Sequence, residues 1–551
     1  MGANHRNGAP QSCRMDREES IVKIRLIEPK APGLNVFDRA LLPRLGLPLI
    51  GRVLADHGHD VRIYVETLAP VSWDDVAQAD LVGFSTTTAT TPMAYRMAQR
   101  LRDLNIPTVI GGPHATFLPE EGLEQCDFVV RREGQVTMLE LVETLEAGRD
   151  VSRISGLSYL SPAGEPVHNP DRPPCPPEQF AHLPAPALDL IVGSERMTNI
   201  PIMTQWGCPF NCDFCSVVHM FGRRVRSRSI SDVLDELETY RGRGAVFFYD
   251  DNFVVDKRRT KALLRGMLER DLTPSWSAQM RAEAVFRDKR TRELDHELLA
   301  LMRDSGCNMV YCGFESVSQA TLDAYNKRQN VRDVQESMQA FHRHGIHVHG
   351  MFVLGADTDD ETIFERTVDF ALENDIDTVQ FLMLTPCPGT PFYERMVEQD
   401  RLLTEDLSLY DGHHCVVEPK LMSAYALQMG TCRSMARFYS VGHVMGLFLS
   451  NVTRNLPFFV SLLWRERGLR LQLPRIAVLS LVPDRWPDLL GMLRETLSHE
   501  SWRRLQEILT VPMLRLYGYR HVREWLKQSR SQAYIDRLRE LMEPQRRPAG
   551  A

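Results

Sequence analysis

The sequence has no long apolar run and little cysteine. No apolar stretch reaches the roughly 18 residues that a membrane-spanning helix needs, and residues 1–20 lack the apolar core of a secretory signal. Cysteine accounts for 11 of the 551 residues, while glycine (34) and proline (33) are near average. The ordinary glycine and proline contents exclude a collagen-like chain and a wholly disordered chain. The low cysteine content excludes a disulfide scaffold. We therefore expect a cytoplasmic protein with reduced thiols and without a transmembrane segment.

Charge is distributed unevenly along the chain. The net charge is −7, but residues 421–551 contain twenty Lys and Arg against ten Asp and Glu, so the preceding residues carry a net charge of −17. Such a basic tail can bind nucleic acid, anionic lipid or an acidic partner. We favour a solvated helical face that docks on the acidic body, and we expect no stable nucleic-acid complex.

Residues 21–150 alternate short apolar runs with helical periods. The runs that read as strands lie at 21–29, 61–66, 80–88, 107–114 and 127–134. This alternation predicts an open parallel sheet with helices on both faces, which binds ligands at the carboxyl ends of its strands.

Residues 1–20 are predicted to form a disordered tail. Residues 151–195, with nine prolines between 162 and 186, are predicted to form an extended linker.

A second alternating series fills residues 196–415. Its six strand-like runs, with helical patterns between them, predict βα repeats that form a closed or partial barrel, with chemistry on the loops after the strands. From residue 416 the strand patterns stop, so residues 416–551 are predicted to form a helical domain. Residues 446–464 are apolar and aromatic, which favours a packed core element. The alternative is a surface that meets a membrane or an apolar substrate.

Three cysteines follow the first strand of the second series. Cys208, Cys212 and Cys215 lie within eight residues on one loop, so their thiolates can converge on one cluster or metal ion. A structural zinc ion normally takes a fourth protein ligand, and no second cysteine pair follows nearby. Three thiolates instead suit a [4Fe–4S] cluster that keeps one iron open, because a complete protein set would be four. A zinc or electron-transfer site is the alternative.

The Cys-x-x-x-Cys-x-x-Cys spacing after a strand resembles the radical S-adenosylmethionine (SAM) superfamily. The resemblance implies that Cys208, Cys212 and Cys215 bind a [4Fe–4S] cluster whose open iron takes the amino and carboxylate groups of SAM. In this superfamily one electron from the cluster cleaves SAM to methionine and a 5′-deoxyadenosyl radical. The electron donor would be a flavodoxin or a ferredoxin.

Further strand ends of the barrel match the superfamily at SAM-contacting positions. Asp250 and Asp251 end the second strand, where the family binds the methionine part of SAM. Glu315 ends the fourth strand and is expected to accept hydrogen bonds from the ribose, and Gly355 ends the fifth. Carboxylates at strand ends suit an amino group and hydroxyl groups. Each of these residues could instead be a helix cap or a turn residue.

The N-terminal half resembles the cobalamin (B12)-binding domain that precedes many radical SAM domains. The matching residues are Ser85 and Thr86 after one strand and Gly111 and Gly112 after the next. Small residues at strand ends let a bulky corrin approach the backbone. The Asp-x-His-x-x-Gly loop that supplies a lower histidine ligand in classical cobalamin enzymes is missing.

Together these features predict an α/β protein in three parts. They are a Rossmann-like doubly wound parallel sheet, a radical SAM (β/α)6 partial barrel and an α-helical C-terminal domain. The resemblance covers about residues 21–410 and is nearest the group of the anaerobic magnesium-protoporphyrin ester cyclase and the hopanoid and phosphonate methylases. It implies cobalamin-dependent methyl transfer to an unactivated carbon of a small molecule. The apolar, aromatic C-terminal domain favours a lipid, an isoprenoid or a tetrapyrrole as this substrate, although ordinary helix packing explains the same pattern. The alternatives are a radical SAM cyclase or C–C coupling enzyme, and a non-catalytic corrinoid or Fe–S sensor.

Overall fold

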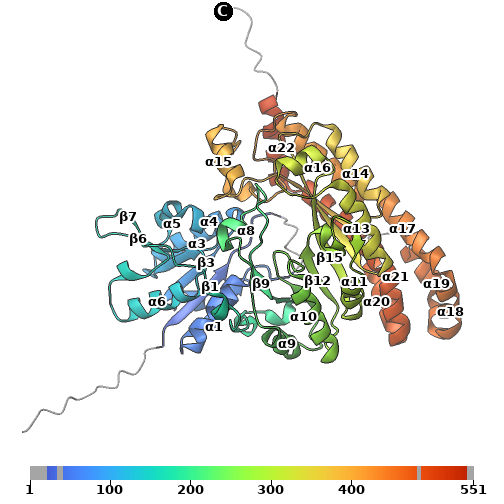
Figure 1. The fold of residues 1–551 in the computed structure, drawn as a ribbon, viewed down its shortest axis with the longest axis horizontal. Helices are drawn as coiled ribbons and strands as arrows, with labels where there is room; N and C mark the ends of the chain where they lie inside the picture. Colours follow the sequence, from blue (N-terminus) through green and yellow to red (C-terminus); the bar gives the residue numbers. More distant parts are fainter. Residues whose placement is uncertain (1–20, 34–40, 481–485, 543–551) are drawn as a thin grey trace, which may run out of the picture.

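The N-terminal part of the protein is a sheet covered by helices on both faces (Figure 1). The structure is a computed structural model that describes residues 21–33, 41–480 and 486–542. The predicted tail, residues 1–20, lies outside the described residues. The sheet has the order β2-β1-β3-β4-β5-β6-β7, in which the first five strands are parallel. These five strands are β1 (Lys23–Glu28), β2 (Asp60–Val65), β3 (Leu81–Ser85), β4 (Thr108–Gly111) and β5 (Phe128–Val130).

Apolar side chains alternate between the two faces of this sheet and so fix where the helices pack. Leu26 of β1 belongs to one core cluster with α1 (Gly46–Asp56) and α6 (Gln135–Glu146), while its neighbour Ile27 belongs to another with α3 (Thr91–Arg102) and α5 (Pro119–Gln125). The chain therefore winds in both directions from β1 and β3. In a sheet of this kind the ligand crevice lies outside the carboxyl ends of the strands where the winding reverses.

The segment 151–195 differs from the expected linker because part of it joins the sheet. β6 (Leu157–Leu160) pairs antiparallel with β5, and β7 (Pro166–His168) pairs antiparallel with β6 at the edge. The prolines are compatible with this pairing because Pro162 follows β6 and Pro166 is the first residue of the edge strand. The remaining residues of the segment cross to the second sheet with only short helical turns.

The second sheet is a six-stranded, all-parallel partial barrel. Its order is β17-β16-β15-β12-β11-β8. The strands are β8 (Asn199–Ile202), β11 (Ala245–Phe248), β12 (Trp276–Met280), β15 (Cys307–Glu315), β16 (His347–Leu354) and β17 (Thr378–Met383). The longer helices between successive strands are α9 (Ile230–Thr239), α10 (Lys257–Glu269), α11 (His296–Asp304), α13 (Val331–Arg343) and α14 (Thr362–Glu373).

The C-terminal part is helical and packs against the last barrel strand (Figure 1). The hydroxyl oxygen of Tyr439 accepts a hydrogen bond from the Val379 N–H at 2.9 Å, and the same hydroxyl donates to the Val379 carbonyl at 2.6 Å. Arg515 donates to the carbonyls of Ile376 and Asp377 at 2.6 and 2.8 Å. No helix of the described residues is long and apolar enough to cross a membrane. The helices are α16 (Ala424–Phe438), α17 (Val441–Arg454), α18 (Leu456–Arg465), α19 (Arg467–Ser480), α20 (Trp486–Thr496), α21 (His499–Leu526) and α22 (Ser529–Met542).

A buried ion pair joins the first sheet to the barrel. Glu133, just after β5, pairs with Arg226 at 2.6 Å, and both side chains are almost fully buried. Glu133 also accepts the backbone N–H of Cys175, while Arg226 donates to the Cys175 carbonyl. Next to it, Arg132 donates to the carbonyl of His219 in the barrel part. These contacts hold the two sheets in one orientation.

Replacing Glu133 with Gln should loosen this junction. The change leaves the Arg226 charge buried without its partner, which costs about 3 kcal/mol of unfolding free energy. The matched control is Glu238→Gln, which breaks the exposed pair between Glu238 and Arg241 and should leave the melting temperature unchanged. Differential scanning calorimetry of the cofactor-free protein measures both. Equal melting temperatures of the two variants would contradict the assigned role of Glu133.

Candidate functional site

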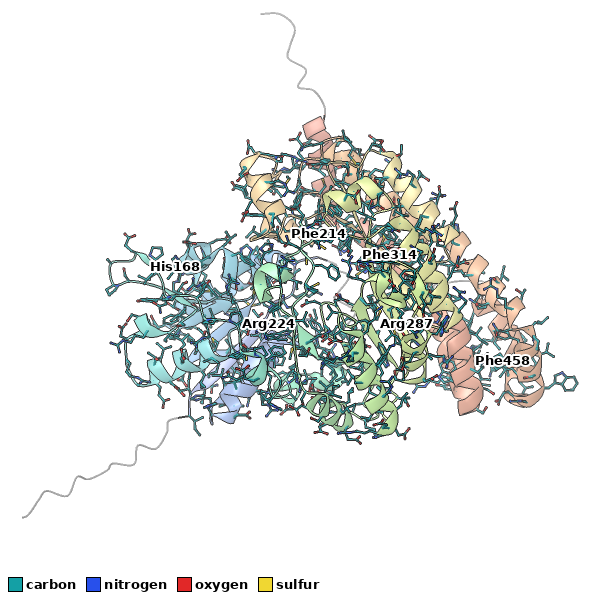
Figure 2. All side chains as sticks on the ribbon, in the orientation of Figure 1. His168, Phe214, Arg224, Arg287, Phe314 and Phe458 are labelled. Carbon is teal, nitrogen blue, oxygen red and sulfur yellow. The ribbon has the colours of Figure 1, made fainter. Side chains whose placement is uncertain are left out.

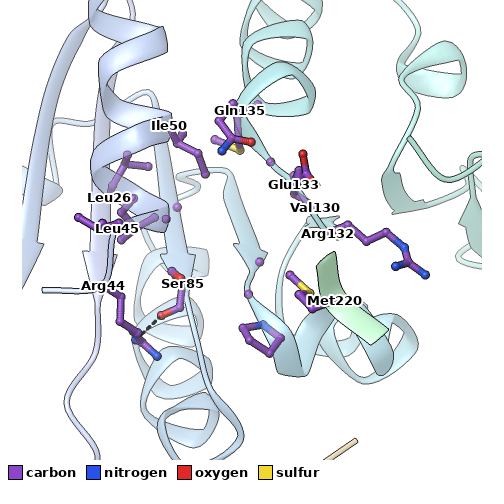
Figure 3. Close-up of a pocket in the computed structure, with 18 of the residues that line it drawn as sticks. Leu26, Arg44, Leu45, Ile50, Ser85, Val130, Arg132, Glu133, Gln135 and Met220 are labelled. Carbon is purple, nitrogen blue, oxygen red and sulfur yellow. Dashed lines mark hydrogen bonds between the residues drawn. The ribbon is translucent and has the colours of Figure 1, made fainter. Parts of the chain in front are cut away.

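A cavity of about 260 Å³ lies where the carboxyl ends of β3, β4 and β5 face the barrel part (Figure 3). Ser85, Gly111 and Gly112, all predicted from the sequence, line it. Thr86 does not line it, because this residue is fully buried and donates its N–H to the Gly111 carbonyl at 3.0 Å. None of the described lining residues is a histidine. The barrel part contributes Trp206, Met220, Phe221, Tyr249 and Asp251.

Gly112 is required by the backbone geometry of this cavity. Its φ of 101° and ψ of 179° lie in a region that is essentially restricted to glycine. A Cβ atom at this position would lie 2.3 Å from the Thr86 carbonyl oxygen. The glycine therefore lets the loops after β3 and β4 approach each other and keeps the floor of the cavity free of side chains.

The sequence analysis missed Arg44 and Glu28. Arg44 donates to the Ser85 carbonyl at 3.0 Å (Figure 3). It also pairs at 3.3 Å with Glu28, which ends β1. Burial raises the pKa of Glu28 despite this pairing. The rule that ligands bind at strand ends could have identified Glu28. It could not have identified Arg44, which precedes α1 and reaches the strand ends only in the folded chain.

A second cavity, of about 480 Å³, lies next to the first, between the two domains. Arg44, Tyr249 and Asp251 line both cavities. The second cavity also has Phe247 and Gln279 from β11 and β12 in its wall. Residues of both domains therefore form a wall that the two cavities share.

The cysteine loop lies between β9 (Gln205–Trp206) and α8 (Val217–Phe221) and is held by residues distant in the sequence. Asp213 forms a two-point ion pair with Arg395 of α15 (Pro391–Glu398), at 2.9 and 2.5 Å, and donates its N–H to the Tyr325 carbonyl. Asn326 donates to the Asn211 carbonyl at 2.8 Å. Phe214, from the same loop, lies in the middle of the molecule (Figure 2). The loop thus has no regular structure of its own but has a defined shape.

The three thiols of Cys208, Cys212 and Cys215 are half-buried on this loop. Burial raises the pKa of the Cys208 thiol and raises the pKa of Cys215 to about 12, and in both cases the Cys212 thiol adds to the effect. Within the described part of the chain, no three His, Cys, Asp or Glu side chains are gathered to hold a metal ion. The thiols thus do not converge on one point in this structure. Loading a cluster on them would release protons, because thiolates are the ligands.

Asp250 and Asp251, at the end of β11, have different roles. Asp250 is buried and accepts hydrogen bonds from Thr204 N–H at 2.7 Å, the Thr204 hydroxyl at 2.5 Å and Gln205 N–H at 3.2 Å. It therefore fixes the turn that leads to the cysteine loop. Asp251 accepts the Gly207 N–H at 3.3 Å and lines both cavities. Burial raises the pKa of each carboxyl to about 6.

Glu315 is connected to the cysteine loop by a chain of contacts. It adopts a φ of +63° and pairs with buried Lys327 at 2.6 Å. Burial opposes the charge on Lys327, but its ion pair with Glu315 outweighs burial and raises the pKa of the lysine. Arg281 donates to the Lys327 carbonyl at 2.5 Å and lies 3.9 Å above the ring of Phe210 in the cysteine loop. A positive-φ carboxylate beside the loop suits a binding role.

Gly355 has a packing role in this structure. Its φ is +97°, and a Cβ atom would lie 2.5 Å from a methyl group of Leu427 in α16. It lines neither of the two cavities between the sheets. The glycine is thus explained by the close approach of α16 to the end of β16.

Gly112→Ala should destabilise the cofactor-free protein by about 3 kcal/mol, because alanine disfavours this backbone conformation and its Cβ meets the Thr86 carbonyl. The control is Gly46→Ala. Gly46 lines the same cavity, but a Cβ atom at this position would meet no atom within 4 Å. Thermal unfolding followed by circular dichroism should show a lower midpoint for Gly112→Ala alone. If both variants melt with the wild type, the strain assigned to Gly112 is wrong.

Two family profiles match the chain in the order expected. The profile of the radical SAM superfamily matches residues 202–371, and that of the B12 binding domain matches residues 39–142. Both agree with the predicted cofactors, a [4Fe–4S] cluster, SAM and cobalamin. They confirm the resemblance inferred from the cysteine motif and from the strand-end glycines.

Curated relatives extend over most of the chain. An uncharacterised methyltransferase of Pyrococcus horikoshii is 32% identical over 440 residues, covering 76% of this chain and 93% of the relative. The bacteriochlorophyllide d C-12(1)-methyltransferase of Chlorobaculum tepidum is 28% identical, covering 78% and 90%. The hopanoid C-2 methylase of Rhodopseudomonas palustris is 26% identical, covering 67% and 66%.

Solved structures share the fold. The cobalamin-dependent SAM radical enzyme OxsB with bound aqua-cobalamin aligns with a TM-score of 0.62 at 16% identity, covering 95% of this chain and 84% of that one. The radical SAM methyltransferase TsrM of Kitasatospora setae, with cobalamin and a [4Fe–4S] cluster, aligns with a TM-score of 0.56 at 18% identity, covering 69% and 75%. The predicted three-part α/β architecture is confirmed.

Proposed function

The chain belongs to the radical SAM superfamily, with a B12-binding domain before its barrel, and on this premise we propose that it is a cobalamin-dependent methyltransferase acting on an unactivated carbon. The observation that carries the proposal is the pair of neighbouring cavities between the two domains, which share lining residues. Arg44, from the first domain, and Tyr249 and Asp251, from the barrel, line both cavities. A corrin at the strand ends of the first sheet and SAM at the strand ends of the barrel would therefore lie next to each other, as methyl transfer between them requires.

The residues present fit the three groups. Cys208, Cys212 and Cys215 offer three thiols on one loop, which suits a [4Fe–4S] cluster with one open iron. The floor at Gly111 and Gly112 carries no side chain, which suits a flat macrocycle. Asp251 offers an acceptor to the amino group of SAM. When bound, these groups supply one-electron cleavage of SAM and a carrier for the methyl group.

The protein's own residues position these groups and exclude water. Asp250 orients the turn before the cysteines, and Lys327 holds the carboxylate of Glu315, to which we assign the binding of hydroxyl groups. Trp206 stacks on Phe221 with ring centroids 5.2 Å apart and, with Tyr249, gives the first cavity an apolar wall on the barrel side. An apolar wall protects a reactive carbon-centred species from solvent.

We further propose a tetrapyrrole or polycyclic lipid as the substrate. The named relatives act on bacteriochlorophyllide d and on hopanoids, and both molecules are large, flat and mostly apolar. The anaerobic magnesium-protoporphyrin IX monomethyl ester cyclase of Rubrivivax gelatinosus is 26% identical over 69% of this chain and 67% of its own length. It is the reason to keep cyclisation as the second candidate. A flavodoxin or ferredoxin is the proposed electron donor, and the cytoplasm is the proposed location.

Cys212→Ser should abolish cluster binding. Anaerobic reconstitution with iron and sulfide should give about four irons per wild-type chain. The serine variant should retain almost none and should form no 5′-deoxyadenosine from SAM. The matched control is Cys175→Ser, a similarly half-buried thiol outside the loop, which should behave as wild type. Full iron content in Cys212→Ser would remove this residue from the ligand set.

Methyl transfer is tested with SAM carrying a trideuterated methyl group. The reconstituted enzyme, supplied with cobalamin and a reductant, is incubated separately with bacteriochlorophyllide d and with a hopanoid. Methyl transfer predicts S-adenosylhomocysteine together with a product heavier by the labelled methyl group, both measured by mass spectrometry. Formation of 5′-deoxyadenosine with neither of these products would favour the cyclase alternative.

A further inference from the structure

A row of apolar side chains on α18 faces solvent. Leu456, Val460 and Trp464 follow one another at intervals of four residues, so they share one side of the helix. Their exposed fractions are 54%, 47% and 76%. Leu462, from the opposite side of α18, is buried in a core with α19 and α20. The exposed row is therefore additional to the side chains that fold this part of the chain.

The two helices next to α18 carry further exposed leucines. Leu449 of α17 is 58% exposed and Leu471 of α19 is 85% exposed. Both helices contact α18. We call Leu449, Leu456, Val460, Trp464 and Leu471 the apolar ridge. Monomeric proteins normally expose such residues singly, so a gathering on adjacent helices indicates an interaction surface.

The segment that carries the ridge is strongly basic. Residues 441–480 contain five arginines, one glutamate and neither lysine nor aspartate. The glutamate, Glu466, accepts hydrogen bonds from the hydroxyls of Ser498 and Ser501 at 2.6 and 2.7 Å. Arg454 and Arg465 flank the α18 row and are exposed. A surface of leucine, valine and tryptophan bordered by arginine complements an anionic lipid interface.

We propose that the apolar ridge docks this protein on the surface of an anionic phospholipid bilayer. The ridge side chains enter the headgroup region, and the arginines pair with lipid phosphates. The helices lie along the surface, because none of the described ones can cross a bilayer. Basic side chains within reach of an anionic surface strengthen such binding by roughly fivefold each.

The docking surface lies away from the cofactor space. Phe458, near the start of α18, marks the end of the molecule opposite the first sheet (Figure 2), while α8, which lines the first cavity, lies on the other side of the barrel strands (Figure 1). Attachment by the ridge thus leaves the space between the two sheets open. The inference goes beyond the proposed methyl transfer and does not depend on it.

The test is co-sedimentation of the cofactor-loaded full chain with vesicles. The vesicles consist of phosphatidylcholine alone or of equal parts phosphatidylcholine and phosphatidylglycerol. The wild type should bind the anionic vesicles and release from them in 0.5 M salt. The double variant Val460→Ser/Trp464→Ser should lose at least tenfold in vesicle affinity, and Arg454→Glu/Arg465→Glu at least 20-fold at low salt. The control Leu104→Ser/Leu421→Ser changes two similarly exposed leucines elsewhere and should bind as wild type.

Iron content and circular dichroism verify that each variant is folded, and formation of 5′-deoxyadenosine should be equal in all of them. The proposal would be overturned if Val460→Ser/Trp464→Ser and Arg454→Glu/Arg465→Glu both bound anionic vesicles as tightly as the wild type. It would also be overturned if the wild type bound no vesicles. Light scattering identifies the competing occupant. A wild-type dimer that becomes a monomer in Val460→Ser/Trp464→Ser, without vesicle binding, would assign the ridge to a second copy of this chain. Loss of SAM cleavage in every protein with vesicle binding intact would count against the proposed activity alone.

Discussion

The arrangement of the site depends on one constraint, which is that an irregular loop must hold three thiols without help from secondary structure. The loop's own backbone supplies few hydrogen bonds, so side chains from elsewhere fix it. Arg395 clamps Asp213, Asn326 holds the Asn211 carbonyl, and Asp250 fixes the preceding turn. These partners lie in segments that follow three different barrel strands, β17, β15 and β11. The loop is therefore shaped only when the whole barrel has formed, which links cofactor binding to folding.

The space between the sheets belongs to neither domain. The first sheet contributes a floor of glycines and the Arg44 side chain, and the barrel contributes Tyr249 and Asp251. The pair formed by Glu133 and Arg226 keeps these two halves together. Glu133 also lines the first cavity, so the contact that orients the domains is part of the wall of that cavity. Alignment of the two halves is thus a property of the junction.

Sequence patterns predicted the strands, the order of the domains and the cysteine loop, because apolar periodicity and short spacings are local signals. They did not predict that β6 and β7 would extend the first sheet, since proline density hides strands whose prolines lie at their ends. They indicated Thr86 and Gly355 as cofactor contacts because both residues follow strands. The burial of Thr86 and the close approach of Leu427 to Gly355 depend on the tertiary structure. Arg44 was not predicted because it reaches the strand ends only in the folded chain. Local spacing identified candidate ligands. Only the fold distinguishes the residues that line the cavities from those that support the lining residues.

The hydroxyl of Tyr439 has a consequence for the solubility of the chain. An open barrel leaves β17 as an edge strand, and the outward backbone groups of an edge strand can recruit a strand from another molecule. Tyr439 occupies both outward groups of Val379, and Arg515 occupies the carbonyls just before the strand. The helical domain therefore acts as a cap against edge-to-edge aggregation. A homologue with a shorter C-terminal part must protect its last strand by other means.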